Sequence, residues 1–91
     1  MPPEPAYTIL YKHSVEKDLR KLPQEVRSAV VRKIQALAHN SRPVGAVKLR
    51  GSEHLYRVRQ ADYRIVYQIN DGELVVLVIK VGHRKEVYRE T

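Results

Sequence analysis

The residues best suited to chemistry are basic and lie in the second half of the chain. Arg57 and Arg59 alternate with Tyr56 and Val58, and Arg64 follows shortly after. Because successive side chains on a strand point to opposite faces, Arg57 and Arg59 are expected to share one face. Guanidinium groups bind phosphate through a planar pair of donors and stay charged at any biological pH. By itself, this pattern is more typical of an ordinary solvent-facing strand. Further evidence is needed to favour a phosphate-binding face.

Further candidates flank this segment on both sides. Lys48 and Arg50 make the preceding loop basic, while His83, Arg84 and Tyr88 follow the last apolar run. A compact sheet could gather the tail residues beside the strand arginines. Taken alone, Tyr88 is equally compatible with an aromatic that packs on the core, and His83 with a surface or capping imidazole.

These residue types fit one reaction class better than the others. The sequence contains no Cys, and its four histidines lie far apart, so we expect no thiolate, redox or metal site and no cofactor. RNA supplies its own nucleophile, because the 2′-hydroxyl adjoins the scissile phosphate. An enzyme then needs only to orient that hydroxyl, move protons and stabilise the charge that builds on phosphorus. DNA lacks the hydroxyl, so a metal-independent site of this kind favours RNA.

Composition agrees with a polyanionic partner. The chain has 91 residues, enough for one domain, and a formal net charge of +7. Such an excess attracts nucleic acid, although a basic surface that merely aids solubility gives the same composition. The longest uncharged apolar run, Leu74 to Ile79, is six residues, whereas a membrane span needs about 20. With no signal-peptide pattern at the start, we expect a cytoplasmic protein that does not enter membranes.

Local patterns predict helices in the first half of the chain. Residues Tyr7–Tyr11 are aromatic and β-branched, which is typical of a short strand. Ser14 is expected to cap a first helix, whose apolar residues recur at helical spacing up to Pro23. Because proline is tolerated in a first helical turn, a second helix is expected from Pro23 through Asn40.

The second half is expected to form a sheet. Residues Ser41–His54 contain one proline and two glycines and lack a sustained period, which predicts a loop. Asn70-Asp71-Gly72 predicts a hairpin turn. Strands are expected at Leu55–Arg59, Arg64–Ile69 and Leu74–Val81. The predicted fold is a single α+β domain over residues 1–91, ordered β-α-α-β-β-β, with a mainly antiparallel four-stranded sheet packed against an N-terminal helical hairpin.

Four spaced motifs resemble the signatures of RelE-type toxins of type II toxin–antitoxin systems, over roughly Tyr7 to Tyr88. They are Lys48-Leu49-Arg50-Gly51, Leu55-Tyr56-Arg57-Val58-Arg59, Asp62-Tyr63-Arg64-Ile65-Val66-Tyr67 and Val81-Gly82-His83-Arg84-Lys85-Glu86-Val87-Tyr88. The resemblance implies cleavage of mRNA in the ribosomal decoding site by 2′-hydroxyl attack, without a metal. It also implies a cognate antitoxin that, in a toxin–antitoxin hetero-oligomer, masks this face or displaces the tail.

The resemblance also implies roles for individual residues. Arg57 and Arg59 match the basic pair on the second strand, and Arg64 matches the transition-state cation. Arg84 matches the cation assigned to the leaving group, and Tyr88 the proposed general base. The best-known members carry lysines in place of Arg57 and Arg59, and arginine is a poor proton shuttle. His83 is therefore a further catalytic candidate, since an unperturbed imidazole titrates near pH 6.5.

Two other functions compete with the ribonuclease. The related ParE-type toxins inhibit DNA gyrase without being enzymes and share the fold, but their tail usually lacks the final tyrosine. A basic module that binds RNA or the ribosome without cutting fits the composition equally well. The presence of both Arg84 and Tyr88 in the tail favours the nuclease, by fold-level analogy.

Overall fold

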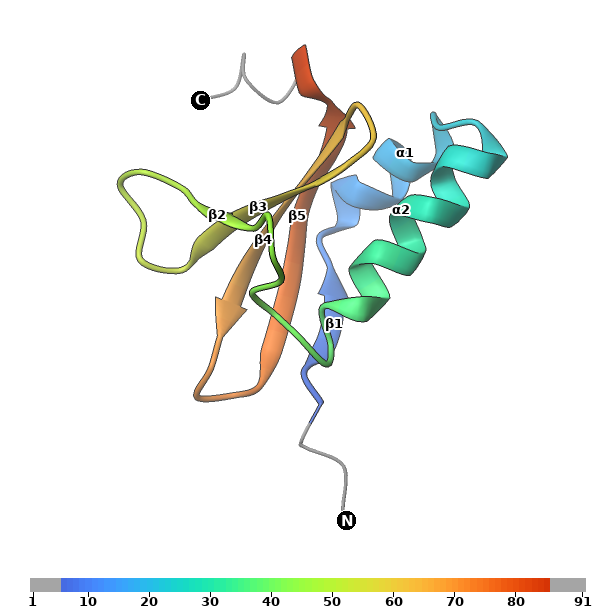
Figure 1. Cartoon of the computed structure of the whole chain (residues 1–91). Coiled ribbons are helices and arrows are strands. Elements are labelled where there is room, and N and C mark those ends of the chain that lie inside the picture. Colours follow the sequence, from blue (N-terminus) through green and yellow to red (C-terminus); the bar gives the residue numbers. More distant parts are fainter. Residues whose placement is uncertain (1–5, 86–91) are drawn as a thin grey trace.

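The structure is a computed structural model that describes residues 6–85 (Figure 1). Figure 1 shows the two helices side by side on one face of a twisted sheet, with the other face left uncovered by helices. This arrangement confirms the predicted α+β class and the helical hairpin. Within residues 6–85 the elements are β1 (Thr8–Tyr11), α1 (His13–Arg20), α2 (Gln24–Ala36), β2 (Val47–Lys48), β3 (Leu55–Gln60), β4 (Tyr63–Asn70) and β5 (Val75–His83).

The sheet is mixed, with strand order β1-β5-β4-β3-β2. β3, β4 and β5 form a continuous antiparallel meander, and β1 adds to β5 in parallel. The predicted mainly antiparallel sheet is therefore confirmed. Between β4 and β5 the register shifts at Val66/Tyr67, so that Val66 lies opposite Lys80 and Tyr67 opposite Val78. The residue between them, Ile79, is the extra residue of a bulge.

The predicted count of four strands was wrong, because a fifth strand forms inside the expected loop. β2 comprises only Val47 and Lys48, which pair antiparallel with Arg57 and Tyr56 of β3. A two-residue strand is too short to show an alternating pattern. The glycine at position 51, with φ of 79°, reverses the chain between β2 and β3.

Two helix boundaries also differ from expectation. α1 begins at His13 with Lys12 as its N-cap residue, so Ser14 lies inside the first turn and does not cap it. α2 ends at Ala36 and not at Asn40. At this point the hydrogen bonds change from the α-helical pattern, between residues four apart, to one between residues three apart. The N–H of Leu37 donates to the carbonyl of Ile34 at 3.0 Å. The tighter turn directs Leu37, which is fully buried, into the core.

The core lies between the helical hairpin and the sheet. Every second residue of β4 from Ile65 onward faces the helices, which is the period expected of a strand with one covered face. Each fully buried aliphatic side chain contributes about 1.5–3 kcal/mol. The buried apolar residues are Val15, Leu22, Val30, Ile34, Leu37, Val58, Ile65, Tyr67, Ile69, Val76, Val78 and Val81. Neither described helix is long and apolar enough to span a bilayer.

Candidate functional site

Three arginines lie on the sheet face that the helices leave uncovered. In the β3–β4 register Arg59 is the direct partner of Arg64, and Arg57 is the direct partner of Val66. Residues two apart on a strand share a face, so Arg57, Arg59 and Arg64 lie on one face, opposite the core residues Val58 and Ile65. We call this surface the arginine face. It confirms the alternation predicted for β3 and adds Arg64 to the same group.

The three arginines differ in exposure. Arg59 is exposed and Arg57 is half-buried, whereas Arg64 is only 3% exposed. Arg57 and Arg64 are each engaged in an interaction within the chain. A buried guanidinium is held in one orientation by its surroundings, and its charge acts through a lower dielectric than that of an exposed one. The face therefore combines a buried cation with an exposed one.

The end of β5 approaches the arginine face at the hairpin turn between β3 and β4. Gly82 is the direct partner of Arg64, and the backbone N–H of Arg84 donates to the carbonyl of Asp62 at 2.9 Å. Ala61 in the same turn has φ of 53°, in the left-handed region that disfavours residues with a Cβ. This hydrogen bond holds the backbone of Arg84 next to Asp62, which is three residues from Arg59 and two residues from Arg64 in the sequence.

His83 lies away from the arginine face. It pairs with Tyr63, one residue before Arg64, and therefore occupies the opposite side of the sheet. Its ring contacts that of Tyr63 edge-on at 5.7 Å, and its Nδ1 accepts a hydrogen bond from the backbone N–H of Lys85 at 3.3 Å. Of the other tail candidates, Arg84 is exposed, and Tyr88 lies outside the described residues.

Lys48 and Arg50 lie at the far edge of the sheet. Both are exposed, Lys48 in β2 opposite Tyr56 and Arg50 in the turn that follows. The N–H of Leu49 donates to the carbonyl of Leu55 at 2.9 Å, which closes this loop against β3. The two cations extend the basic surface along β3 but are not part of the arginine face. Lys48 pairs with Tyr56 and therefore lies on the opposite side of the sheet from Arg57.

A polar cluster that the sequence did not indicate anchors the loop before β2. Arg42 binds Asp71 through two hydrogen bonds, the shorter of which joins Nη2 to Oδ2 at 2.9 Å. Its Nε donates to the hydroxyl of Tyr56 at 3.1 Å, and Tyr7 also donates to Asp71. These bonds, first those from Arg42 and then that from Tyr7, hold the pKa of Asp71 below its usual value. The partners are 14 to 64 residues apart in sequence, so no local motif could reveal them.

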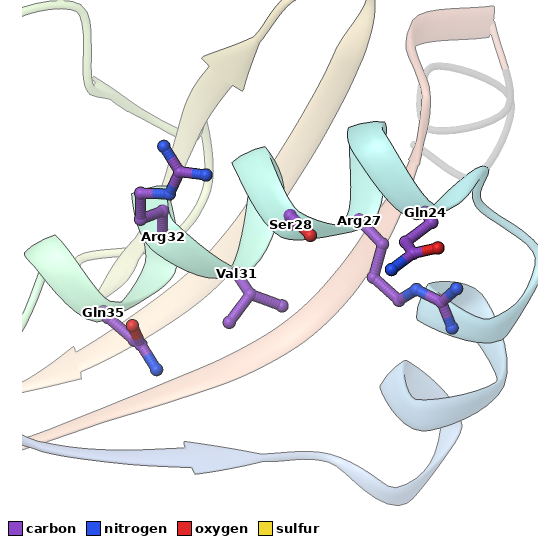
Figure 2. Close-up of a pocket in the computed structure, with 6 residues that line it drawn as sticks. All are labelled: Gln24, Arg27, Ser28, Val31, Arg32 and Gln35. Atoms are coloured by element: carbon purple, nitrogen blue, oxygen red, sulfur yellow. The ribbon is translucent and has the colours of Figure 1, made fainter.

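A shallow depression on the outer surface of α2 contains two further arginines, but they do not form a site. Figure 2 shows Arg27 and Arg32 extending in different directions from this helix. The lining residues are Gln24, Arg27, Ser28, Val31, Arg32 and Gln35. Among residues 6–85, no group of three histidine or carboxylate side chains is placed to hold a metal ion.

Comparison with known proteins places this geometry in a family. Residues 9–88 match the family model described as the ParE toxin of the type II toxin–antitoxin system parDE. The chain is 38% identical to the mRNA interferase toxin RelE of Escherichia coli K12, over 93% of each chain. The isolated E. coli RelE toxin has a similar structure, with a TM-score of 0.76, 36% identity, and coverage of 93% of this chain and 94% of that one. The toxin in the intact E. coli RelBE toxin–antitoxin complex is likewise similar, with a TM-score of 0.75, 34% identity, and coverage of 86% and 96%.

Proposed function

Because this chain belongs to the RelE toxin family, within the wider group of RelE and ParE toxins, we propose that it is the toxin of a type II toxin–antitoxin pair and cleaves mRNA. The single toxin domain, residues 1–91, acts on translating ribosomes in the cytoplasm and thereby arrests growth. The observation that supports this function best is the arginine face, in which Arg59 and Arg64 are direct cross-strand partners beside Arg57.

The arginines bind RNA and stabilise the transition state. Arg57 and Arg59 hold phosphates of the mRNA through bidentate hydrogen bonds. Arg64, whose side chain is buried, stabilises the extra negative charge on the scissile phosphate. The attacking group is the 2′-hydroxyl of the RNA, so the reaction leaves a cyclic phosphate and a free 5′-hydroxyl. Because no water has to be activated, this mechanism uses no metal ion or cofactor.

Proton transfer falls to residues of the C-terminal tail. Arginines at positions 57 and 59 keep their protons at cytoplasmic pH, so neither serves as the base. We assign to Tyr88 the removal of the proton from the 2′-hydroxyl. Arg84 stabilises the 5′-oxygen, which leaves with the electrons of the broken P–O bond and takes up a proton from water. His83 is the alternative base, but its position beside Tyr63, on the face opposite Arg64, supports it less well.

The remaining basic residues extend RNA binding, and a protein partner controls it. Lys48 and Arg50 bind the RNA backbone beyond the scissile phosphate. The E. coli RelE toxin forms a complex with its antitoxin RelB. We infer that this chain has a cognate antitoxin too, which binds in a hetero-oligomer and neutralises the arginine face.

Two tail variants test the ribonuclease. Arg84→Ala and Tyr88→Phe should each abolish mRNA cleavage in a translating extract, while ribosome binding measured by co-sedimentation stays within about twofold of wild type, because neither change removes the arginine face. Unchanged cleavage in both variants would overturn the assignment of the site. Ribosome binding by the wild type without any cleavage would indicate a non-cleaving module instead.

A second function is considered because the matching family model is that of a ParE toxin. ParE-type toxins inhibit DNA gyrase, so the alternative is a non-enzymatic gyrase inhibitor built on the same fold. A supercoiling assay with purified protein separates the two functions. Inhibition of supercoiling without RNA cleavage would establish the alternative, and cleavage without inhibition is the result we expect.

A further inference from the structure

The edge of β5 that faces α1 loses its strand partner halfway along. β1 pairs with β5 only as far as Tyr11 and Val78, and the last bond of this pairing is from the N–H of Lys12 to the carbonyl of Val78 at 2.9 Å. β5 continues to His83. The N–H groups of its second half that point away from β4 therefore need a partner other than a strand, because an unsatisfied buried N–H costs about 1–3 kcal/mol.

Asp18 of α1 supplies that partner. Its Oδ2 accepts a hydrogen bond from the backbone N–H of Val81 at 3.2 Å. Its Oδ1 lies 3.5 Å from Nζ of Lys80, and the Asp18 side chain is only 11% exposed. A carboxylate that accepts a backbone N–H forms a charge-assisted hydrogen bond, which is stronger than one between neutral groups. One side chain of a helix thus takes over the role of the missing strand.

The bond from Asp18 fixes the part of β5 that leads to the arginine face. Val81 is fully within the core and pairs with Ile65. The next residue, Gly82, lies opposite Arg64, and two residues later the N–H of Arg84 binds the carbonyl of Asp62. The bulge at Ile79 lies just before this segment and loosens its pairing with β4. Asp18 therefore clamps β5 directly between the bulge and Arg84.

We propose that Asp18 is a positioning residue for the cleavage reaction. Its side-chain hydrogen bonds within residues 6–85 are with Val81 and Lys80, and it acts by holding the end of β5 so that Arg84 stays at a fixed distance from Arg64. The proposal rests on the function proposed above. It concerns the hydrogen bond to Val81. The ion pair with Lys80, which is 3.5 Å long and whose lysine side chain is 27% exposed, is a separate contribution that is tested separately.

Four variants separate these contributions. Asp18→Ala removes both contacts, and Asp18→Asn keeps an acceptor oxygen for Val81 but no charge. Lys80→Met removes the ion pair and leaves the bond to Val81. Glu16→Ala, an exposed acidic residue of the same helix, is the matched control for the loss of one negative charge from α1. Thermal unfolding of all four establishes that each is folded at the assay temperature.

The first readout is mRNA cleavage in a translating extract, measured as the maximal rate and as the toxin concentration that gives half of it. Asp18→Ala should lower the maximal rate about tenfold and leave the half-saturating concentration within about twofold, because misplacement by roughly 1 Å can cost as much as 100-fold. Asp18→Asn should recover to within about threefold of wild type, as should Lys80→Met. Glu16→Ala should match wild type. An equal loss in Asp18→Asn and Asp18→Ala, or no loss in a folded Asp18→Ala, would overturn the proposal.

The second readout does not depend on activity. Amide hydrogen exchange, followed by NMR, should speed up at Val81 and at Arg84 in Asp18→Ala and stay close to wild type in Asp18→Asn. If the wild-type protein cleaves no RNA, the proposed function fails, and the exchange at Arg84 still decides whether Asp18 positions this segment. Unchanged exchange at Arg84 in Asp18→Ala would overturn the positioning role even if the wild type is an active nuclease.

Discussion

Arg59 and Arg64 are direct cross-strand partners, two residues on either side of the turn between β3 and β4. Like charges in this position destabilise a sheet, and the burial of Arg64 strengthens their repulsion by lowering the local dielectric. We expect a phosphate to bind between the two cations and thereby to remove this repulsion. The pair would then be unfavourable for folding and favourable for binding an anion, which is the balance expected of a functional site.

This balance predicts that removal of the exposed partner stabilises the protein. Arg59→Gln should raise the free energy of unfolding by about 0.2–1 kcal/mol in low salt, because one of two like charges is lost. The same variant should bind RNA more weakly. Urea denaturation measures the stability, and Arg50→Gln, in the exposed loop, serves as the control that should leave stability unchanged. A less stable Arg59→Gln would show that the pair does not repel in the folded protein.

The contribution of Arg57 to RNA binding should be visible in how the RNA affinity depends on salt concentration. If its guanidinium contacts one phosphate, Arg57→Ala should reduce the slope of log affinity against log salt concentration by about one unit. Filter binding to a single-stranded RNA over a range of KCl concentrations gives the slope. Arg32→Ala, on the outer surface of α2, removes the same charge away from the arginine face and should leave the slope unaltered. Equal effects of the two variants would indicate attraction by net charge alone.

The arginine face was predictable from the sequence because strand alternation is a local rule. Arg57 and Arg59 are two residues apart, so their shared face followed directly from the pattern of β3. The partnership of Arg59 with Arg64 depends on the length of the turn between the strands. That turn has two residues and begins with Ala61 at positive φ. Alanine gives no sign of such a conformation, so the register could not be derived in advance.

The turn between β4 and β5 likewise has a backbone conformation that its residue types did not reveal. Asn70-Asp71-Gly72 was expected to form a hairpin turn, and a turn does follow β4, but the residue with positive φ is Leu74, at 55°. Asn70 acts instead through its side chain, whose Oδ1 accepts the N–H of Glu73 at 3.0 Å. Tertiary contacts of the turn residues decide between these conformations. The strand was consequently expected one residue too early, at Leu74, and it begins at Val75.

The residues that hold the site in place were not predictable, since they act through long-range contacts. Asp18 and Val81 are 63 residues apart in sequence, and Arg42 and Asp71 are 29 apart. A single sequence gives no signal that joins such positions. His83 illustrates the opposite case: its chemistry made it a candidate, and only the sheet register reveals that it lies on the side of Tyr63.

A buried hydrogen bond predicts a loss of stability in Tyr67→Phe. The Tyr67 hydroxyl donates to the backbone carbonyl of Ser41 at 2.8 Å, and both residues are buried. Burial also raises the pKa of Tyr67 to about 12, so the hydroxyl remains a donor at neutral pH. Without it the carbonyl is left unsatisfied, which should cost about 1–3 kcal/mol in urea denaturation. The half-buried Tyr63→Phe is the control, and equal losses in both would mean that the bond to Ser41 contributes nothing specific.

The cluster around Asp71 predicts sensitivity to acid. Hydrogen bonds from Arg42 and Tyr7 lower the pKa of Asp71 from its usual value of 3.8. A carboxyl whose pKa is lower in the folded state stabilises the fold fully above the unfolded pKa, and this stabilisation is lost as the pH falls through the folded pKa. Asp71→Asn should therefore reduce the drop in Tm between pH 7 and pH 3. The neighbouring Glu73→Gln is the control. A drop in Tm as large in Asp71→Asn as in wild type would contradict the role of this carboxylate.

Two matched mRNAs in a translating extract can establish whether this toxin cleaves RNA by using the 2′-hydroxyl as nucleophile. One carries ribose throughout, and the other has a single 2′-deoxynucleotide at the mapped cleavage position. We expect the first mRNA to be cut, leaving a cyclic phosphate and a 5′-hydroxyl, and the second to stay intact at that position. Cleavage of both at the same position and rate, or of neither, would contradict this mechanism.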